Sequence, residues 1–350
     1  MSVTAGLPDW PRSAPPPLTA AVLRATPEDF VVEEQLPFTL AGSGEHLWVK
    51  LRKRGWNTEQ TGRELARRAG VTRRDVGYAG MKDRHAVTVQ WFSLHLAGRA
   101  DPDWQGLPDG MQVLEAVRHT RKLKTGALEG NCFAITLRDC QGDLGQLHAR
   151  LESIRQQGVP NYFGEQRFGR DAENIRHARA MFAGTEVVRD RHKRGIYLSA
   201  ARSWLFNAVL AERIRRRIWQ TALRGETCIL AGSNSFFVAE SADETIEERL
   251  RFHDIHLSGP LWGEGEPPTR DEVHALEMQV AAGEPELVQG LAGAGLRQER
   301  RALRVIPSGL TAEAVDASGW RLSFCLPPGC YATAVLRELA HYSTSHHSPA

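Results

Sequence analysis

The 350-residue sequence has no run of about 18 apolar residues, so it predicts no helix that spans a membrane. It also lacks the phosphate loop GxxxxGK[ST], the zinc motif HExxH, the nucleophile elbow GxSxG and a dinucleotide-binding fingerprint after a strand. These absences argue against P-loop NTPases, HExxH metalloproteases, α/β-hydrolases and Rossmann dehydrogenases. The first residues show neither an apolar h-region nor an amphipathic Arg/Ser pattern, so we expect no signal or transit peptide and a cytoplasmic location.

Cysteine is scarce as well. The five cysteines are odd in number, and no two have the spacing of a zinc knuckle or a redox pair: Cys132, Cys140, Cys228, Cys325 and Cys330. We therefore expect reduced, mostly buried thiols. His341, His346 and His347 resemble a frayed tail without partner ligands, so no metal site is expected there.

The formal net charge is only +2, but basic and acidic residues are segregated along the chain. Acidic residues gather in 240–248 and 264–272, and basic residues gather in 52–54, 118–124, 213–217 and 296–304. Such segregation can create a positive face that attracts phosphates. For each basic run taken alone, a solvated helix face explains the pattern too.

The order of elements predicts an α+β fold. Strand patterns at 30–34, 45–52, 111–117 and 131–138 precede a helix-rich middle that includes 200–219 and 271–282. Strands return at 301–306 and 320–326, followed by a closing helix at 332–341. One sheet domain with an insertion and two consecutive domains both fit this order.

Residues 77–91 form a glycine-punctuated turn that opens into a strand. Gly77 and Gly80 allow positive φ and close approach to a ligand, and basic neighbours favour the ionised form of Asp83. The strand alternates apolar and polar side chains, which predicts burial on one face. Asp83 is thus a candidate nucleophile or base, although an ordinary surface-hairpin aspartate fits the pattern equally well.

Other candidates stand near strand ends. Arg24 is a cation at the start of the first predicted strand, and Asn131 offers a donor and an acceptor to the edge of a pyrimidine. Phe30, Phe133 and Tyr331 could stack on a base. An exposed arginine, a turn asparagine and core aromatic residues are the structural alternatives, and the residues alone do not decide between them.

Together and in this order, nine segments resemble the TruD family of tRNA pseudouridine synthases over most of the chain. They are 27–33, 44–47, 55–58, 79–91, 130–133, 159–169, 198–203, 326–329 and 332–339. The most specific are GxKDxxAxTxQ around Asp83 and PNYFGxQRFG at 160–169.

The resemblance implies a V-shaped α+β protein whose pseudouridine synthase core has a mixed, largely antiparallel sheet. The core would comprise 1–159 and 309–350, and an inserted α/β TRUD domain would occupy 160–308. The implied activity is isomerisation of uridine to pseudouridine in tRNA, at position 13 of the D arm in bacterial members. We expect tRNA as partner, no membrane, no metal or organic cofactor, and a monomer.

Carried over by residue, the resemblance makes Asp83 the catalytic aspartate and Arg24 its basic partner, where many members have lysine. Phe133 would stack on the target base and, lacking a hydroxyl, could not accept a proton. Residues implied to contact the substrate are Phe30, Asn131, Tyr331, Lys82 and Gly80. Addition to C6, attack on C1′ and removal of a ribose proton stay open as roles for Asp83. A non-catalytic tRNA-binding or folding helper and a metal-assisted RNA hydrolase are the competing functions.

Overall fold

The computed structural model describes residues 7–344 and divides the chain into two compact units. The sheet unit comprises 16–156, 307–329 and 339–344, and the helical unit comprises 7–15, 157–306 and 330–338. None of the helices within residues 7–344 is long and apolar enough to cross a membrane.

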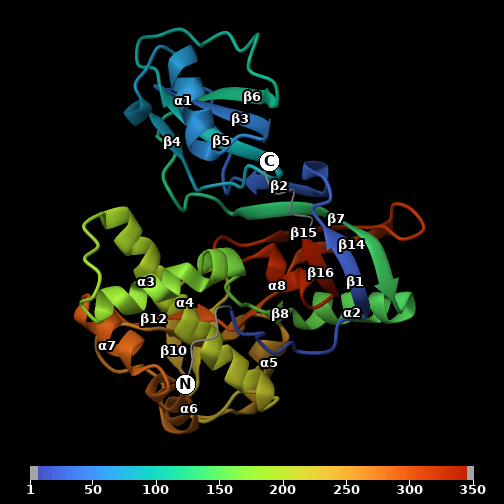
Figure 1. Ribbon diagram of the computed structural model, residues 1–350, viewed down its shortest axis with the longest axis vertical. Coiled ribbons are helices and arrows are strands. Elements are labelled where there is room, and N and C mark those ends of the chain that lie inside the picture. Colours follow the sequence, from blue (N-terminus) through green and yellow to red (C-terminus); the bar gives the residue numbers. More distant parts are fainter. Residues whose placement is uncertain (1–6, 345–350) are drawn as a thin grey trace. The chain divides into compact units, whose positions relative to one another are not determined.

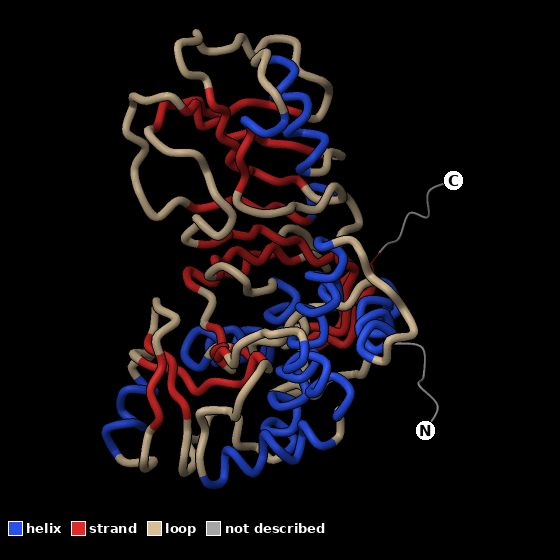
Figure 2. Tube along the Cα trace, turned by 90° about the vertical axis from the view of Figure 1, so that its left-hand side faces the viewer, coloured by secondary structure: helices blue, strands red, loops and turns tan. Residues whose placement is uncertain are grey.

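The sheet unit is built on a ten-stranded sheet whose main path runs β14-β15-β7-β2-β5-β3-β6 (Figures 1 and 2). Off this path, β1 pairs with β7 and β16, and β4 pairs with β5. The pairs β2·β5 and β1·β16 are parallel, and the other pairs of this sheet are antiparallel. The strands are β1 (Leu18–Leu23), β2 (Phe30–Gln35), β3 (His46–Arg54), β4 (Val76–Tyr78), β5 (Val87–His95), β6 (Met111–His119), β7 (Gly130–Gly142), β14 (Ser308–Ala314), β15 (Trp320–Leu326) and β16 (Ala340–Thr344). The predicted mixed, largely antiparallel sheet is confirmed.

Two α-helices and two short 3-10 helices accompany this sheet: α1 (Thr58–Arg68), α2 (Leu144–Gln157), η1 (Pro27–Asp29) and η2 (Arg73–Asp75). Asn57 caps α1 in a capping box, because its side chain accepts the N–H of Gln60 and the Gln60 side chain bonds back to the N–H of Asn57. Leu65 of α1 packs in one core cluster with apolar side chains of β3 and β5. The predicted half-burial of β5 is wrong: Val87 to Leu94 are all buried, because Phe92 packs against α1 on one face and Trp91 packs with Ala79 and Leu123 on the other.

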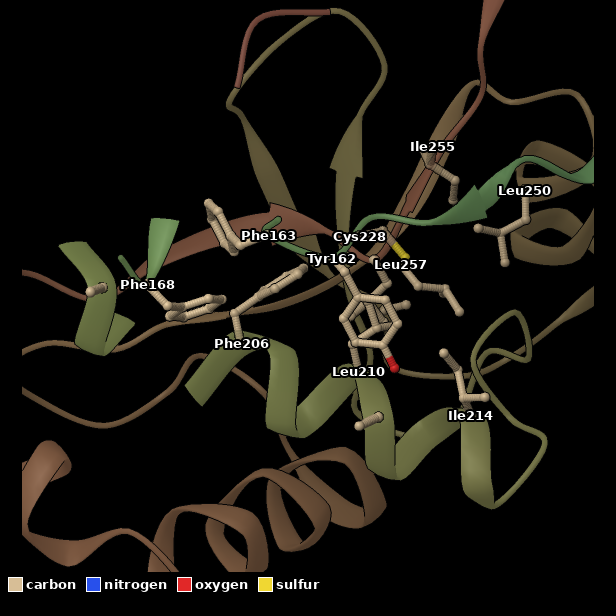
Figure 3. Packing of buried hydrophobic residues seen from close by; sticks show 14 of the residues in the cluster. Tyr162, Phe163, Phe168, Phe206, Leu210, Ile214, Cys228, Leu250, Ile255 and Leu257 are labelled. Carbon is tan, nitrogen blue, oxygen red and sulfur yellow. The ribbon is translucent and has the colours of Figure 1, made fainter. Parts of the chain in front are cut away.

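The helical unit combines helices with an antiparallel sheet of order β10-β9-β11-β12 and a small pair, β13·β8. Its helices are α3 (Glu173–Phe182), α4 (Arg191–Arg215), α5 (Glu244–Arg251), α6 (Asp271–Ala282), α7 (Pro285–Gly293) and α8 (Ala332–Leu336), with the short η3 (Glu165–Arg167) and η4 (Arg170–Ala172). Its strands are β8 (Val159–Pro160), β9 (Thr227–Leu230), β10 (Phe236–Val238), β11 (Ile255–Leu261), β12 (Glu299–Ala302) and β13 (Arg304–Val305). Its main core joins Tyr162, Phe163 and Phe168 to Phe206 and Leu210 of α4 (Figure 3).

The closing helix predicted at 332–341 is wrong in its second half. Helix α8 ends at Leu336, and Ala340–Thr344 form β16, which pairs in parallel with β1. His341 is therefore part of a strand rather than of a frayed tail, whereas His346 and His347 lie outside the described residues.

The expectation that all cysteines are reduced is also wrong. Cys132 of β7 and Cys325 of β15 lie directly opposite each other in the antiparallel ladder and form a disulfide, with Cα atoms 3.9 Å apart. Sequence spacing could not reveal this pair, because 193 positions separate the two residues and only strand pairing brings them together.

Candidate active site

Asp83 lies in the turn between β4 and β5 and receives one hydrogen bond on each carboxylate oxygen. The guanidinium of Arg24 donates to Oδ2 at 2.8 Å, and the N–H of His85 donates to Oδ1 at 2.9 Å. The Asp83 side chain is 39% exposed, so the carboxylate remains open to solvent. The structure thus pairs the two residues that the sequence proposed as acid and cation.

The sequence predicts Arg24 at the start of the first strand. This position is wrong, because β1 precedes Arg24, which follows the last residue of that strand. Its φ is 60°, in the left-handed region that costs a residue other than glycine about 1 kcal/mol or more. Its guanidinium lies 4.1 Å from the centre of the Phe30 ring. This cation–π contact and the ion pair with Asp83 both favour a backbone conformation that is otherwise unfavourable.

Aromatic side chains of three neighbouring strands, β2, β7 and β15, contact one another beside Arg24. Phe30 of β2 contacts Phe133 of β7 edge to face, with ring centroids 6.2 Å apart. Phe133 lies opposite Phe324 of β15, and these rings stack at 5.4 Å. Phe133 is half-buried, so part of its surface remains available to a planar ligand.

The turn that carries Asp83 is held by polar side chains from α1 and β5. The hydroxyl of Thr58 accepts the N–H of Lys82 at 2.8 Å and donates to Gln90 at 3.1 Å. The amide of Gln90 donates to the carbonyl of Gly80 at 2.8 Å. Thr58 and Gln90 are fully buried, so they fix the backbone at Gly80 and Lys82, just before Asp83.

Neither Gly77 nor Gly80 adopts the positive φ that glycine allows. At Gly77 the close approach is to the chain itself, because an added Cβ would lie 2.4 Å from the carbonyl oxygen of Leu123. At Gly80 an added Cβ would meet no atom within 4 Å. The fold therefore requires glycine at position 77 but not at position 80.

A group of buried charges lies beside the turn. The ammonium of Lys82 is 2.7 Å from Oδ1 of Asn131 and 2.9 Å from Oε1 of Glu34. Burial raises the pKa of the Glu34 carboxyl, and the charge of Lys82 is the largest opposing effect. Burial likewise lowers the pKa of Lys53 to about 8, and the like charge of Lys82 acts in the same direction.

Tyr331 belongs to the helical unit, unlike the other candidate residues. Its hydroxyl accepts a hydrogen bond from Nε of Arg167 at 2.9 Å, and its ring lies edge to face with Phe163 at 6.0 Å. Arg167 also donates to the hydroxyl of Ser199 at 3.0 Å. The motif at 160–169 therefore builds the surroundings of Tyr331.

The predicted basic runs serve two different purposes. Several of their cations are buried: Lys53 of β3, Arg213 of α4, which pairs with Glu226, and Arg300, which pairs with Glu277. In the run 118–124, by contrast, Arg121 and Lys124 are exposed and line a cavity of about 660 Å³ together with Phe38, Trp48 and His119. A positive surface is therefore expected from this run rather than from every basic segment.

Comparison with known proteins identifies the family. A family model described as tRNA pseudouridine synthase D (TruD) matches residues 16–194 and 176–339. The chain belongs to the TruD family. Its sequence is 50% identical to tRNA pseudouridine synthase D of Nitrosococcus oceani over 327 residues, which are 93% of this chain and 91% of the relative. It is 47% identical to the protein of the same name from Methylococcus capsulatus over 338 residues, which are 96% of each chain.

The fold agrees with a solved structure of the TruD family. The crystal structure described as the putative tRNA pseudouridine synthase D (TruD) from Methanosarcina mazei superposes with a TM-score of 0.72. It covers 94% of this chain and 95% of that chain at 22% sequence identity. The family resemblance and the α+β class with a mixed sheet, both predicted from the sequence, are thus confirmed.

Within this TruD chain, sequence reasoning missed four polar residues of the site: Glu34, Lys53, Thr58 and Gln90. A signal for two of them exists. Glu34 continues the inward alternation of Phe30 and Val32 in β2, and Lys53 continues that of Val49 and Leu51 in β3. A charged residue at an inward position of an otherwise apolar alternation indicates a polar or charged partner on that face of the sheet. Thr58 and Gln90 gave no such signal.

Proposed function

We propose that this TruD family member isomerises uridine to pseudouridine in tRNA, at uridine-13 of the D arm, with Asp83 as nucleophile or base. The observation that carries the proposal is the Asp83 carboxylate, open to solvent and paired at 2.8 Å with Arg24. The guanidinium of Arg24 lies over Phe30, whose ring contacts the half-buried ring of Phe133. A carboxylate aimed by a cation next to a stacking ring suits a reaction on an unstacked nucleotide.

The reaction itself needs few groups. The bond from N1 to C1′ breaks, the uracil turns, and C5 bonds to C1′ while the C5 proton leaves and N1 gains a proton. Addition of Asp83 to C6, its attack on C1′ and its removal of a ribose proton all start from the ionised carboxylate. Phe133 has no hydroxyl, so the C5 proton passes to Asp83, to water or to another group.

The substrate nucleotide has to leave the stacked D arm, which costs a few kcal/mol. Contacts of Phe133 and Phe30 with the extruded base offset this cost of unstacking. Polar contacts from Asn131 and Lys82 offset it further. Exposed cations such as Arg121 and Lys124 compensate by binding phosphates. We assign Tyr331 to the same substrate and Gly80 to close approach of the nucleotide. We further propose that 160–308 form the inserted TRUD domain and that 1–159 with 309–350 form the catalytic domain.

The decisive experiment is Asp83→Asn with chemical mapping of pseudouridine in total tRNA. The variant should bind tRNA as the wild type does but lower the rate of pseudouridine formation by a factor on the order of 10³ or more. Asp101→Asn is the matched control, since Asp101 is an exposed aspartate of the same unit that pairs with Arg118. An undiminished rate in Asp83→Asn would show that another residue performs the chemistry. Binding without pseudouridine formation even in the wild type would favour a tRNA-binding helper.

A further inference from the structure

A continuous chain of polar contacts leads from the interior of the sheet to Asn131. The N–H of Trp91 donates to Oε2 of the buried Glu34 at 2.8 Å, and Oε1 of Glu34 lies 2.9 Å from the ammonium of Lys82. The same ammonium donates to Oδ1 of Asn131 at 2.7 Å. The side chain of Glu34 is fully buried and that of Lys82 is 12% exposed, so this chain has little freedom to rearrange.

These contacts fix which way the Asn131 amide faces. An ammonium carries donors only, so the amide atom that faces Lys82 has to be the oxygen. The amide nitrogen, Nδ2, is then held on the other side, and none of the described residues accepts a hydrogen bond from it. Asn131 and Phe133 are two positions apart on β7, so both side chains lie on the same face of the strand. A base stacked on Phe133 therefore lies on the face of the sheet from which Asn131 projects.

The direction of the amide decides which pyrimidine it can read. Uracil presents an N3–H between two carbonyl oxygens, whereas cytosine presents an unprotonated N3 beside an amino group. An amide that is free to turn by 180° satisfies either base, because its donor and acceptor exchange places. An amide with a fixed oxygen accepts N3–H and donates to a carbonyl of uracil, but opposes the N3 lone pair of cytosine. The oxygen has a second lone pair, so accepting from Lys82 does not prevent it from accepting N3–H.

We propose that Glu34 and Lys82 are positioning residues that hold the Asn131 amide in one orientation and thereby make the site accept uracil and reject cytosine. The inference rests on the proposed function, since it takes the ligand of the site to be a pyrimidine nucleotide. It extends that function by naming the groups that determine base specificity without reacting themselves. It also gives a role to a carboxylate and an ammonium whose burial would otherwise only destabilise the sheet.

The test compares binding of two tRNA transcripts that differ only at the modified position, with uridine in one and cytidine in the other. Asp83→Asn serves as the background, so that no turnover disturbs the equilibrium. In this background the uridine transcript should bind about tenfold more tightly than the cytidine transcript, which corresponds to one hydrogen bond gained or lost. Adding Lys82→Met should bring the ratio of the two dissociation constants close to one.

Two further variants separate specificity from stability. Lys82→Met leaves the Glu34 carboxylate buried without its cation, so the double variant Glu34→Gln with Lys82→Met removes both charges and keeps an oxygen for the N–H of Trp91. It should melt closer to the wild type and show the same loss of discrimination. Lys50→Met is the matched control, because Lys50 pairs at 2.7 Å with Glu33, the residue next to Glu34, and both side chains are partly exposed.

A merely structural role of Lys82 would weaken binding of both transcripts equally and leave the ratio unchanged. An unchanged ratio in both Lys82 variants, or a ratio near one in the Asp83→Asn background, would overturn the inference. If Asp83→Asn still forms pseudouridine, the proposed role of Asp83 fails on that measurement alone. The dissociation constants are then measured at times short relative to turnover, so the two failures remain distinguishable. A double variant that regains the preference for the uridine transcript would also count against the positioning role.

Discussion

Lys53 allows a quantitative test of what the burial of a charge in this sheet costs in free energy of unfolding. Its side chain is fully buried at the end of β3, and its ammonium donates to the carbonyl of Trp56 at 2.8 Å. Burial lowers its pKa from 10.5 to about 8. Titration of Lys53 should therefore contribute to the pH dependence of the free energy of unfolding.

The direction of this dependence follows from proton binding. Between pH 8 and pH 10.5 the ammonium keeps its proton in the unfolded chain and loses it in the folded chain, so the free energy of unfolding rises with pH. Below pH 8 both states are protonated, and the folded state bears the full cost of the buried charge. The difference between the two pKa values corresponds to about 3 kcal/mol.

Lys53→Met keeps the length of the side chain and removes the titration. It also removes the hydrogen bond to Trp56, which costs about 1 kcal/mol at every pH. The free energy of unfolding of the variant minus that of the wild type should therefore be about 2 to 3 kcal/mol larger at pH 7.5 than at pH 10.5. Urea unfolding of both proteins at half-unit pH intervals measures this difference. Burial raises the pKa values of Cys140 to about 11 and Cys228 to about 12, but both thiols titrate in both proteins and cancel in the comparison.

Arg52→Met is the control, since Arg52 is an exposed cation of the same strand and arginine keeps its charge throughout this range. Its difference from the wild type should be constant with pH. If the difference between Lys53→Met and the wild type is also constant from pH 7.5 to 10.5, the ammonium of Lys53 is not penalised by burial and the reasoning fails.

Three further outcomes are expected. Arg24→Met removes the cation 2.8 Å from the Asp83 carboxylate and should lower the single-turnover rate constant about tenfold with little change in KM, whereas Arg24→Lys should keep most of the activity. Equal single-turnover rate constants for the wild type and Arg24→Met would contradict this. Phe133→Leu should lower kcat/KM for tRNA about 10-fold to 100-fold through lost base stacking, and Phe133→Tyr should not; an unaffected Leu variant would exclude stacking on this ring. Reduction of the disulfide between Cys132 and Cys325, which closes a separation of 193 positions, should lower the free energy of unfolding by about 2 to 4 kcal/mol; a urea midpoint indifferent to dithiothreitol would refute this.

Local signals predicted much of the fold. The capping box at Asn57 marks the start of α1, and the sequence pattern reproduces the bounds of β15 and α6. Predictions failed where a distant partner decides the structure. Residues 340–344 form a strand because β1 offers a parallel edge, and β5 is buried on both faces because α1 packs on one face and Ala79 and Leu123 pack on the other.

The same contrast between local signals and distant partners holds for the candidate site. Asp83 and Arg24 were named from charge and motif, and the structure joins them although 59 positions separate them. The support of the turn could not be foreseen, because Thr58 and Gln90 act through hydrogen bonds to backbone atoms of another element. The disulfide of Cys132 was missed for the same reason, since strand pairing alone brings its partner close.

The buried charges show where function and folding conflict in this sheet. An uncompensated carboxylate or ammonium at an inward position costs several kcal/mol, and apolar residues at positions 34 and 53 would satisfy the strand pattern better. Glu34 and Lys53 nevertheless lie beneath the turn that carries Asp83, and Lys82 influences the pKa of both. Because Lys82 precedes Asp83 in the chain and contacts Asn131, a change at either buried charge should reach both the Asp83 carboxylate and the Asn131 amide. The two positions that break the alternation are therefore the ones at which stability is exchanged for a defined site geometry.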